Sequence, residues 1–230
     1  MDRADLPFRG GDRPHLLYLR STRSYNKDRI GGLVPQNWRY SAADIYALED
    51  RDLGDVDVLY FTGMHDQVFL KSIEPKLVAY LAAGGNFIIN GHIIRPWLPC
   101  LSTFRAVSPK PYTNWMIRPA QPGAYFGRMD FENFHRHEGI LGQYARGYSP
   151  APAGAQWLCM IGGPGPDGDN NEGPVDWVWR MPGGGKVFVH NGDHVEAFCS
   201  DPRTQPNLLH DILNALLFST EPAAAGDNAG

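Results

Sequence analysis

Short apolar runs alternate with polar segments through the first half of the chain. The runs His15–Arg20, Val56–Thr62 and Asn86–Asn90 are nearly continuous in apolar residues and have the length of strands. Gly, Pro or polar residues bound each of them. We therefore expect three strands that are buried on both faces of a sheet.

Two segments carry the spacing and end signals of helices. Apolar residues recur at helical spacing over Ser72–Ala83, whose first residue is the expected N-cap, with Pro75 in the first turn and Gly84-Gly85 as C-cap. Ser41 is the expected N-cap of a second helix that runs to about Ala47. Strands and helices that alternate through short connections are typical of a mainly parallel sheet covered by helices.

Glycine and proline concentrate in the second half of the chain, where 24 of the 45 lie between Ser108 and Gly185. Around this segment, Ala155–Ile161 is a strand candidate, and Asp176–Met181 with Lys186–His190 is typical of a β-hairpin. Leu208–Phe218 has the pattern of an amphipathic helix.

These elements predict a single α/β domain with a C-terminal β-hairpin. We expect the domain to cover residues 1–219, with a long Gly/Pro-rich irregular insert over residues 108–155 and a disordered tail over residues 220–230.

Composition and charge exclude several classes of protein. A hydrophobic content of 43% with 12% aromatic residues is too high for a disordered chain. The net charge of -4 provides no electrostatic footprint for nucleic acid, and no apolar run reaches the length of a membrane span. Three widely spaced cysteines suggest neither a disulfide framework nor a zinc finger. The N-terminus has no apolar leader, so we expect a cytoplasmic protein.

Candidate site residues follow the predicted strands, because ligands of parallel sheets bind beyond the carboxyl ends of the strands. Each histidine among them is a ligand, an acid or base, or a loop residue that caps a backbone carbonyl. The candidates after the successive strands are Tyr25, His65, Asn90, His92, Arg95, Asp193 and His194.

Three stretches resemble the trehalose-utilisation (ThuA-like) family of the class I glutamine amidotransferase-like superfamily. They are Tyr80–His92, with its Gly-Gly, strand and Gly-His order, the segment Pro174–Trp179, and Gly184–His194 followed by the Leu208–Leu217 helix. The resemblance covers about residues 13–107 and 155–219 and implies a flavodoxin-like three-layer α/β fold. Thr62–His65 with Gly84-Gly85 also resembles the amidotransferase-like domain of the dimethylformamidase large subunit.

The chemistry of glutamine amidotransferases does not carry over. Those enzymes place a nucleophilic cysteine on a tight Gly-x-Cys-x-Gly turn after the strand that corresponds to Asn86–Asn90, where this chain reads Asn90-Gly91-His92. Cys100 lies eight residues beyond His92, next to Pro99, so it does not reach that turn. We therefore do not expect glutamine hydrolysis by a Cys–His pair.

The resemblance instead implies His92 and His194 as the reactive groups, and Asp193 adds a carboxylate where the family commonly has glycine. Two imidazoles and a carboxylate suit a metal such as Zn²⁺, or acid–base chemistry on a small polar, carbohydrate-related substrate. His65, Arg95, Asn90 and Tyr25 would then bind the substrate, and neither a cofactor nor a bound metal can be named. The alternative for His92 is a hydrogen bond to a loop carbonyl. The alternative for the whole chain is a noncatalytic subunit or a homo-oligomeric assembly protein.

Overall fold

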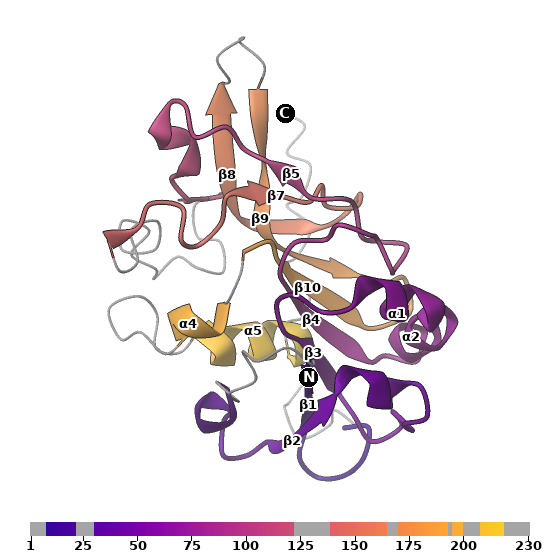
Figure 1. The fold of residues 1–230 in the computed structure, drawn as a ribbon. Helices are drawn as coiled ribbons and strands as arrows, with labels where there is room; N and C mark the ends of the chain where they lie inside the picture. Colours follow the sequence, from indigo (N-terminus) through magenta and orange to yellow (C-terminus); the bar gives the residue numbers. More distant parts are fainter. Residues whose placement is uncertain are drawn as a thin grey trace, which may run out of the picture.

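The computed structural model describes residues 8–21, 30–121, 139–164, 170–192, 195–199 and 208–218 (Figure 1). Its centre is an eight-stranded sheet of order β2-β1-β3-β4-β10-β9-β8-β6. In that order the strands are Arg39–Asp44, His15–Arg20, Val58–Phe61, Asn86–Asn90, Lys186–His190, Asn170–Arg180, Gln156–Pro164 and Arg118–Pro119. A second sheet of two short antiparallel strands pairs β5 (Arg105–Ala106) with β7 (Gly147–Tyr148).

The first five strands of the large sheet run parallel, and the last three are antiparallel to their neighbours. β10 joins the two parts, since it pairs parallel with β4 and antiparallel with β9. The three expected strands of the first half and the C-terminal hairpin are therefore confirmed, as is a mixed α/β fold around a large, mostly parallel sheet.

Few helices accompany the sheet. Among the described residues, the α-helices are α1 (Gln67–Ser72), α2 (Glu74–Ala82), α4 (Val195–Cys199) and α5 (Leu208–Leu217), and short 3-10 helices cover Gly31–Leu33, Ile45–Leu48 and Tyr112–Trp115. No helix among the described residues is long and apolar enough to cross a membrane.

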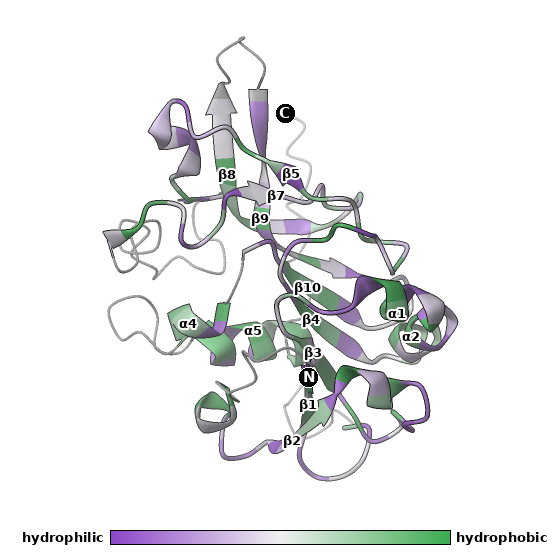
Figure 2. Ribbon diagram, viewed as in Figure 1, coloured by the Kyte–Doolittle hydropathy of each residue, from purple (hydrophilic) through white to green (hydrophobic). Residues whose placement is uncertain are grey.

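Two apolar clusters cover the two faces of the sheet. Leu70 of α1 and Leu77 of α2 belong to the cluster that contains Leu17 and Phe87, whereas α4 and α5 contribute to the cluster that contains Leu16 and Phe188. Neighbouring strand residues such as Leu16 and Leu17 point to opposite faces, so strands buried on both sides read as continuous apolar runs. Figure 2 shows this as hydrophobic colouring along the central strands and along α5.

The helix expected from Ser41 is wrong. Ser41 lies inside β2, which pairs along its whole length with β1, and only a 3-10 turn follows over Ile45–Leu48. The N-cap of this 3-10 turn is Asp44, whose side chain accepts a hydrogen bond from the Tyr46 N–H at 3.0 Å. Pairing with the buried β1 outweighs the local capping signal.

The helix expected over Ser72–Ala83 is confirmed as α2, which spans Glu74–Ala82, but its expected N-cap is wrong because a separate helix, α1, ends at Ser72. α1 begins after Asp66, whose carboxylate accepts hydrogen bonds from Val68 N and Phe69 N, both at 3.0 Å. Ser72 is the last residue of α1 rather than an N-cap, and its hydroxyl donates to the carbonyl of Phe69. Within the segment expected to be an irregular insert, the described residues form the short strands β6 and β7 and one 3-10 turn.

Candidate functional site

A row of four polar side chains crosses one face of the sheet, on four neighbouring strands. Cys159 of β8 pairs with Asp176 of β9, Asp176 pairs with His190 of β10, and His190 pairs with Asn90 of β4. Directly paired residues point to the same face of a sheet. His190 and Asn90 are also the last residues of their parallel strands, so the row ends at the edge where α/β proteins bind ligands.

Asp176 is the centre of this row. Its carboxylate, which is fully buried, accepts hydrogen bonds from His190 Nδ1 at 2.7 Å, from the Tyr144 hydroxyl at 2.5 Å and from Cys159 Sγ at 2.9 Å. Burial, and then the neighbouring Asp176 carboxylate, raise the pKa of Tyr144 and of Cys159 well above their ordinary values. Both groups therefore remain protonated donors at neutral pH.

His190 is oriented with one ring nitrogen still available. A carboxylate only accepts hydrogen bonds, so the contact with Asp176 places a proton on Nδ1 and leaves Nε2 of the neutral ring as an acceptor. Nε2 is buried, and none of the described residues provides a hydrogen-bond partner to it. The Tyr144 ring packs edge-on against the imidazole at 4.7 Å between centroids, which fixes the plane of the ring.

Gly192 lies directly over this nitrogen. A Cβ on Gly192 would stand 2.3 Å from Nε2 of His190 and 1.8 Å from the carbonyl oxygen of Tyr144. Only glycine lets the main chain pass this closely, so the turn after β10 approaches the imidazole with backbone alone.

A second buried carboxylate borders the row. Glu196 of α4 accepts hydrogen bonds from the Tyr60 hydroxyl at 2.8 Å and from Asn90 Nδ2 at 2.7 Å. The Asn90 side-chain oxygen accepts from the Val195 N–H at 3.4 Å. Asn90, expected to bind substrate, instead joins β4 to the start of α4, with both ends of its amide occupied.

His65, also expected to bind substrate, lies in the core. Its Nδ1 contacts the carbonyl of Thr62 at 2.9 Å, and its Nε2 accepts from Trp97 Nε1 at 3.2 Å. Burial lowers the pKa of His65 to about 4, so the ring is neutral at physiological pH. These contacts match the alternative stated for each candidate histidine, that of a loop residue that caps a backbone carbonyl.

His92 and Arg95 lie on the loop after β4. The His92 ring is half-buried and stacks on Phe104, with 3.9 Å between centroids and 18° between planes. Gln67 holds this loop, since its Nε2 donates to the His92 carbonyl at 2.7 Å and its Oε1 accepts from the Arg95 N–H at 2.8 Å. Arg95 is exposed. Tyr25, Asp193 and His194 lie outside the described residues.

The thiols are buried and poorly suited to nucleophilic attack. Burial raises the pKa of Cys100 to about 12 and also raises the pKa of Cys199. A thiol must lose its proton to act as a nucleophile or to bind a metal. Among the described residues, no group of three His, Cys, Asp or Glu side chains could hold a metal ion.

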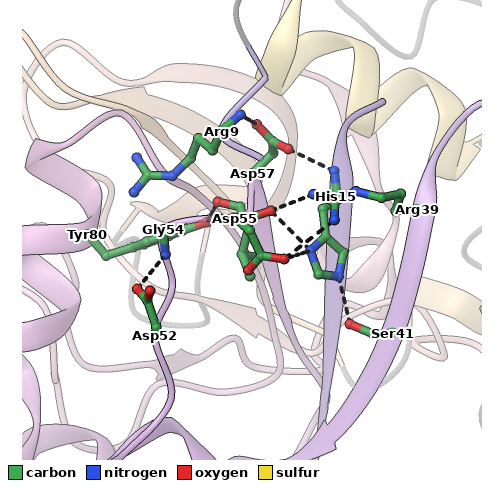
Figure 3. Close-up of polar contacts among 10 residues, drawn as sticks. Arg9, His15, Arg39, Ser41, Asp52, Gly54, Asp55, Asp57 and Tyr80 are labelled. Atoms are coloured by element: carbon green, nitrogen blue, oxygen red, sulfur yellow. Dashed lines mark hydrogen bonds and ion pairs between the residues drawn. The ribbon is translucent and has the colours of Figure 1, made fainter. Parts of the chain in front are cut away.

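A Ser–His–Asp chain lies at the opposite edge of the sheet, near the amino end of β1 (Figure 3). His15 Nε2 contacts Ser41 Oγ at 2.7 Å, and His15 Nδ1 lies 3.2 Å from Asp55 Oδ2 and 3.1 Å from the Asp55 carbonyl oxygen. Arg39 Nη2 donates to that carbonyl at 2.9 Å. These contacts tie the edge strand β2 to β1 and to the loop before β3, and we assign them a structural role.

Sequence reasoning selected the loops after the strands and missed the residues that the strands themselves bring together. Asp176 was not among the candidates, and His190 was only the end of a strand. One signal was present: in the hairpin, residues 176 and 190 are equally distant from residue 183, so a symmetric turn pairs them.

No protein-family model matches the chain, and no curated protein matches it at a significant level. The function must therefore be argued from the geometry of the row Cys159–Asp176–His190–Asn90 and of the residues that border it.

Proposed function

We propose that this protein is an enzyme that transfers protons on a small polar, carbohydrate-related substrate, with His190 as the base and Asp176 as the residue that orients it. The observation that supports the proposal is a buried imidazole whose Nδ1 is held 2.7 Å from a buried carboxylate and whose Nε2 has no partner among the described residues. We further propose a flavodoxin-like, amidotransferase-like domain close to the ThuA-like family, acting without glutamine hydrolysis.

The pair has the arrangement used for general acid–base catalysis. Asp176 fixes the Nδ1–H tautomer, and its negative charge stabilises the imidazolium formed when Nε2 takes a proton from the substrate. The two other donors to Asp176, Tyr144 and Cys159, hold the carboxylate in place. The same imidazolium then returns the proton to the product, so the enzyme ends each cycle unchanged.

The surroundings favour a polar substrate of modest size. Gly192 covers the buried Nε2 with main chain only, so the proposal requires the turn at Asn191–Gly192 to move before a substrate reaches the nitrogen. His92 and Arg95 after β4, together with Asp193, His194 and Tyr25, are the residues that we propose to bind its hydroxyl groups.

Exchange of substrate hydrogen with deuterated solvent tests the proposal. The purified full chain is incubated in D₂O with a panel of aldoses, ketoses and keto-sugars, and loss of C–H signals next to the carbonyl is followed by proton NMR. We expect exchange with at least one substrate, and we expect it to be lost in His190→Ala. A panel that shows no exchange, or equal exchange in the variant, would overturn the proposal.

A second candidate is the noncatalytic, homo-oligomeric assembly protein, and one observation favours it. Met64, Val68 and Ile94 are exposed apolar side chains on two neighbouring segments. Gln67 joins these segments, since its Oε1 accepts a hydrogen bond from the Ile94 N–H at 2.9 Å. Met64 also has a φ of 60°, which is uncommon for a residue other than glycine. Light scattering of wild type and Ile94→Asp separates the candidates, since a dimer that dissociates in the variant supports assembly and a monomeric wild type excludes it.

A further inference from the structure

We infer that the amino edge of the sheet carries a second binding site, for a small phosphomonoester, in a pocket that is separate from the His190–Asp176 pair. The pocket has a volume of about 180 Å³ and lies where β4 and β10 begin. Its walls come from the residues before β1, from the turns before β4 and β10, and from the end of α5; they include Phe8, Arg9, Asp57, Arg180, Lys186 and Leu217.

Positive charge dominates this pocket. Arg9, Arg180 and Lys186 supply three cations, and Asp57 is the single carboxylate in the lining. The two Asp57 oxygens are already occupied, since Oδ1 accepts from the Arg9 backbone N–H at 2.9 Å and Oδ2 from the His15 backbone N–H at 2.8 Å (Figure 3). The lining therefore keeps two net positive charges, which match the charge of a phosphomonoester near neutral pH, about -1.5 to -2.

The three cations differ in what holds them. Arg9 is anchored by a 2.6 Å bond from Nη1 to the Ala83 carbonyl and by the Tyr80 ring, 5.0 Å from its guanidinium carbon. Its Nε is buried and has no hydrogen-bond partner in the described part of the chain. Lys186 is buried and donates from Nζ to the Ala215 carbonyl of α5 at 2.7 Å. Arg180, by contrast, is exposed, and no described residue pairs with its guanidinium. A ligand at this site gives Arg180 the anionic partner that the described residues do not provide.

The floor of the pocket is main chain. The turns before β4 and β10 touch at Gly185, where a Cβ would stand 1.8 Å from the carbonyl oxygen of Gly85. The N–H groups of this floor are used inside the protein, because Gly185 N donates to Leu81 O at 2.8 Å and Gly84 N donates to the same oxygen at 3.0 Å. An anion is therefore held by arginine and lysine side chains, not by a loop of backbone amides as in a phosphate-binding loop.

One wall of the pocket is apolar, and the pocket is small. Phe8, Leu216 and Leu217 line it, and Phe8 also packs edge-on against Phe218 at 6.3 Å. An enclosed cavity of about 150 Å³ holds one benzene ring, whereas drug-sized ligands occupy about 300–1,000 Å³. The pocket thus suits a phosphate group with one small apolar substituent and is too small for a nucleotide.

Titration calorimetry with phenyl phosphate tests the site on the full chain at low salt. We expect saturable binding of one equivalent, and we expect Arg180→Ala to weaken it by about 10-fold or more, the effect of losing one charge-assisted bond. Arg105→Ala is the matched control, because Arg105 is also exposed but lies on β5, outside the pocket lining. Benzoate, with a single negative charge, should bind more weakly than phenyl phosphate.

Three results would overturn the inference. The first is that wild type shows no saturable binding up to about 10 mM ligand, since a dissociation constant that high is typical of non-specific contacts. The second is that Arg180→Ala binds phenyl phosphate with the affinity of wild type. The third is that Arg180→Ala and Arg105→Ala lose the same affinity, which would mean a general effect of charge. Circular dichroism of both variants checks that the fold is intact. None of these outcomes depends on the activity assigned to His190.

Discussion

The replacement Asp176→Asn examines the pair most closely, because it changes one charge and almost no volume. The carboxylate accepts three buried hydrogen bonds. An amide accepts through one oxygen only, and its NH₂ group must donate to a nitrogen without a proton. When the amide donates to His190 Nδ1, the ring proton moves to Nε2, and the base is lost.

Both stability and rate should respond to Asp176→Asn. The amide cannot satisfy all three buried donors, and leaving a buried donor without a partner costs about 1–3 kcal/mol of unfolding free energy. The wrong tautomer in an Asp–His pair lowers the rate about 10⁴-fold in serine hydrolases, and we expect a loss of the same order in the deuterium-exchange assay. Urea unfolding and the exchange rate are measured on the same preparation, under conditions where the variant is folded.

Cys159→Ala is the control for Asp176→Asn. It removes one of the three donors to the same carboxylate without affecting the tautomer of His190. We expect a loss of about 1 kcal/mol in stability and little change in exchange rate. A folded Asp176→Asn variant that exchanges as fast as Cys159→Ala would refute the reasoning.

Two further predictions concern His65 and Gly192. The pKa of His65 is about 4 in the folded chain and 6.5 when unperturbed, so the unfolded chain binds more protons below pH 6.5 and stability falls as the pH drops towards 4. Urea unfolding should show that this group contributes about 2.5 kcal/mol less stability at pH 4.5 than at pH 7.5. His65→Gln should reduce this dependence of stability on pH, and an unchanged dependence would contradict the assignment. Gly192→Ala should lower the melting temperature and abolish deuterium exchange of the substrate, because the added methyl group would collide with His190 Nε2 and the Tyr144 carbonyl. A variant with wild-type stability and exchange rate would show that the turn is not packed against the His190 ring.

The strands were the most predictable part of the fold. Residues buried on both faces leave a continuous apolar run, and β1, β3, β4 and β10 all lie where such runs occur. β2 was missed because it lies at the edge of the sheet, with a polar and partly exposed sequence that carries no such signal. Its position depends on its pairing with β1, which is a tertiary interaction.

The candidate site was less predictable, for a related reason. Its edge of the sheet followed from the rule that ligands bind beyond the carboxyl ends of parallel strands, but its central residues lie within strands and not after them. Asp176 stands beside Trp177 in an apolar strand, and only the register of β8, β9 and β10 brings it to Cys159 and His190. The contacts that Asn90 and His65 make in the structure depend on partners, Glu196 and Trp97, that are far from them in the sequence.

The most direct measurement of the central claim is the solvent-exchange rate of His190→Gln against wild type, with a substrate that wild type deuterates. Glutamine fills a similar volume and keeps a polar group near Asp176, but it cannot take a proton at neutral pH. The account predicts that exchange falls by about 10²–10⁴-fold, the usual contribution of a general base, while the variant remains folded. A folded His190→Gln protein that exchanges at the wild-type rate would contradict it.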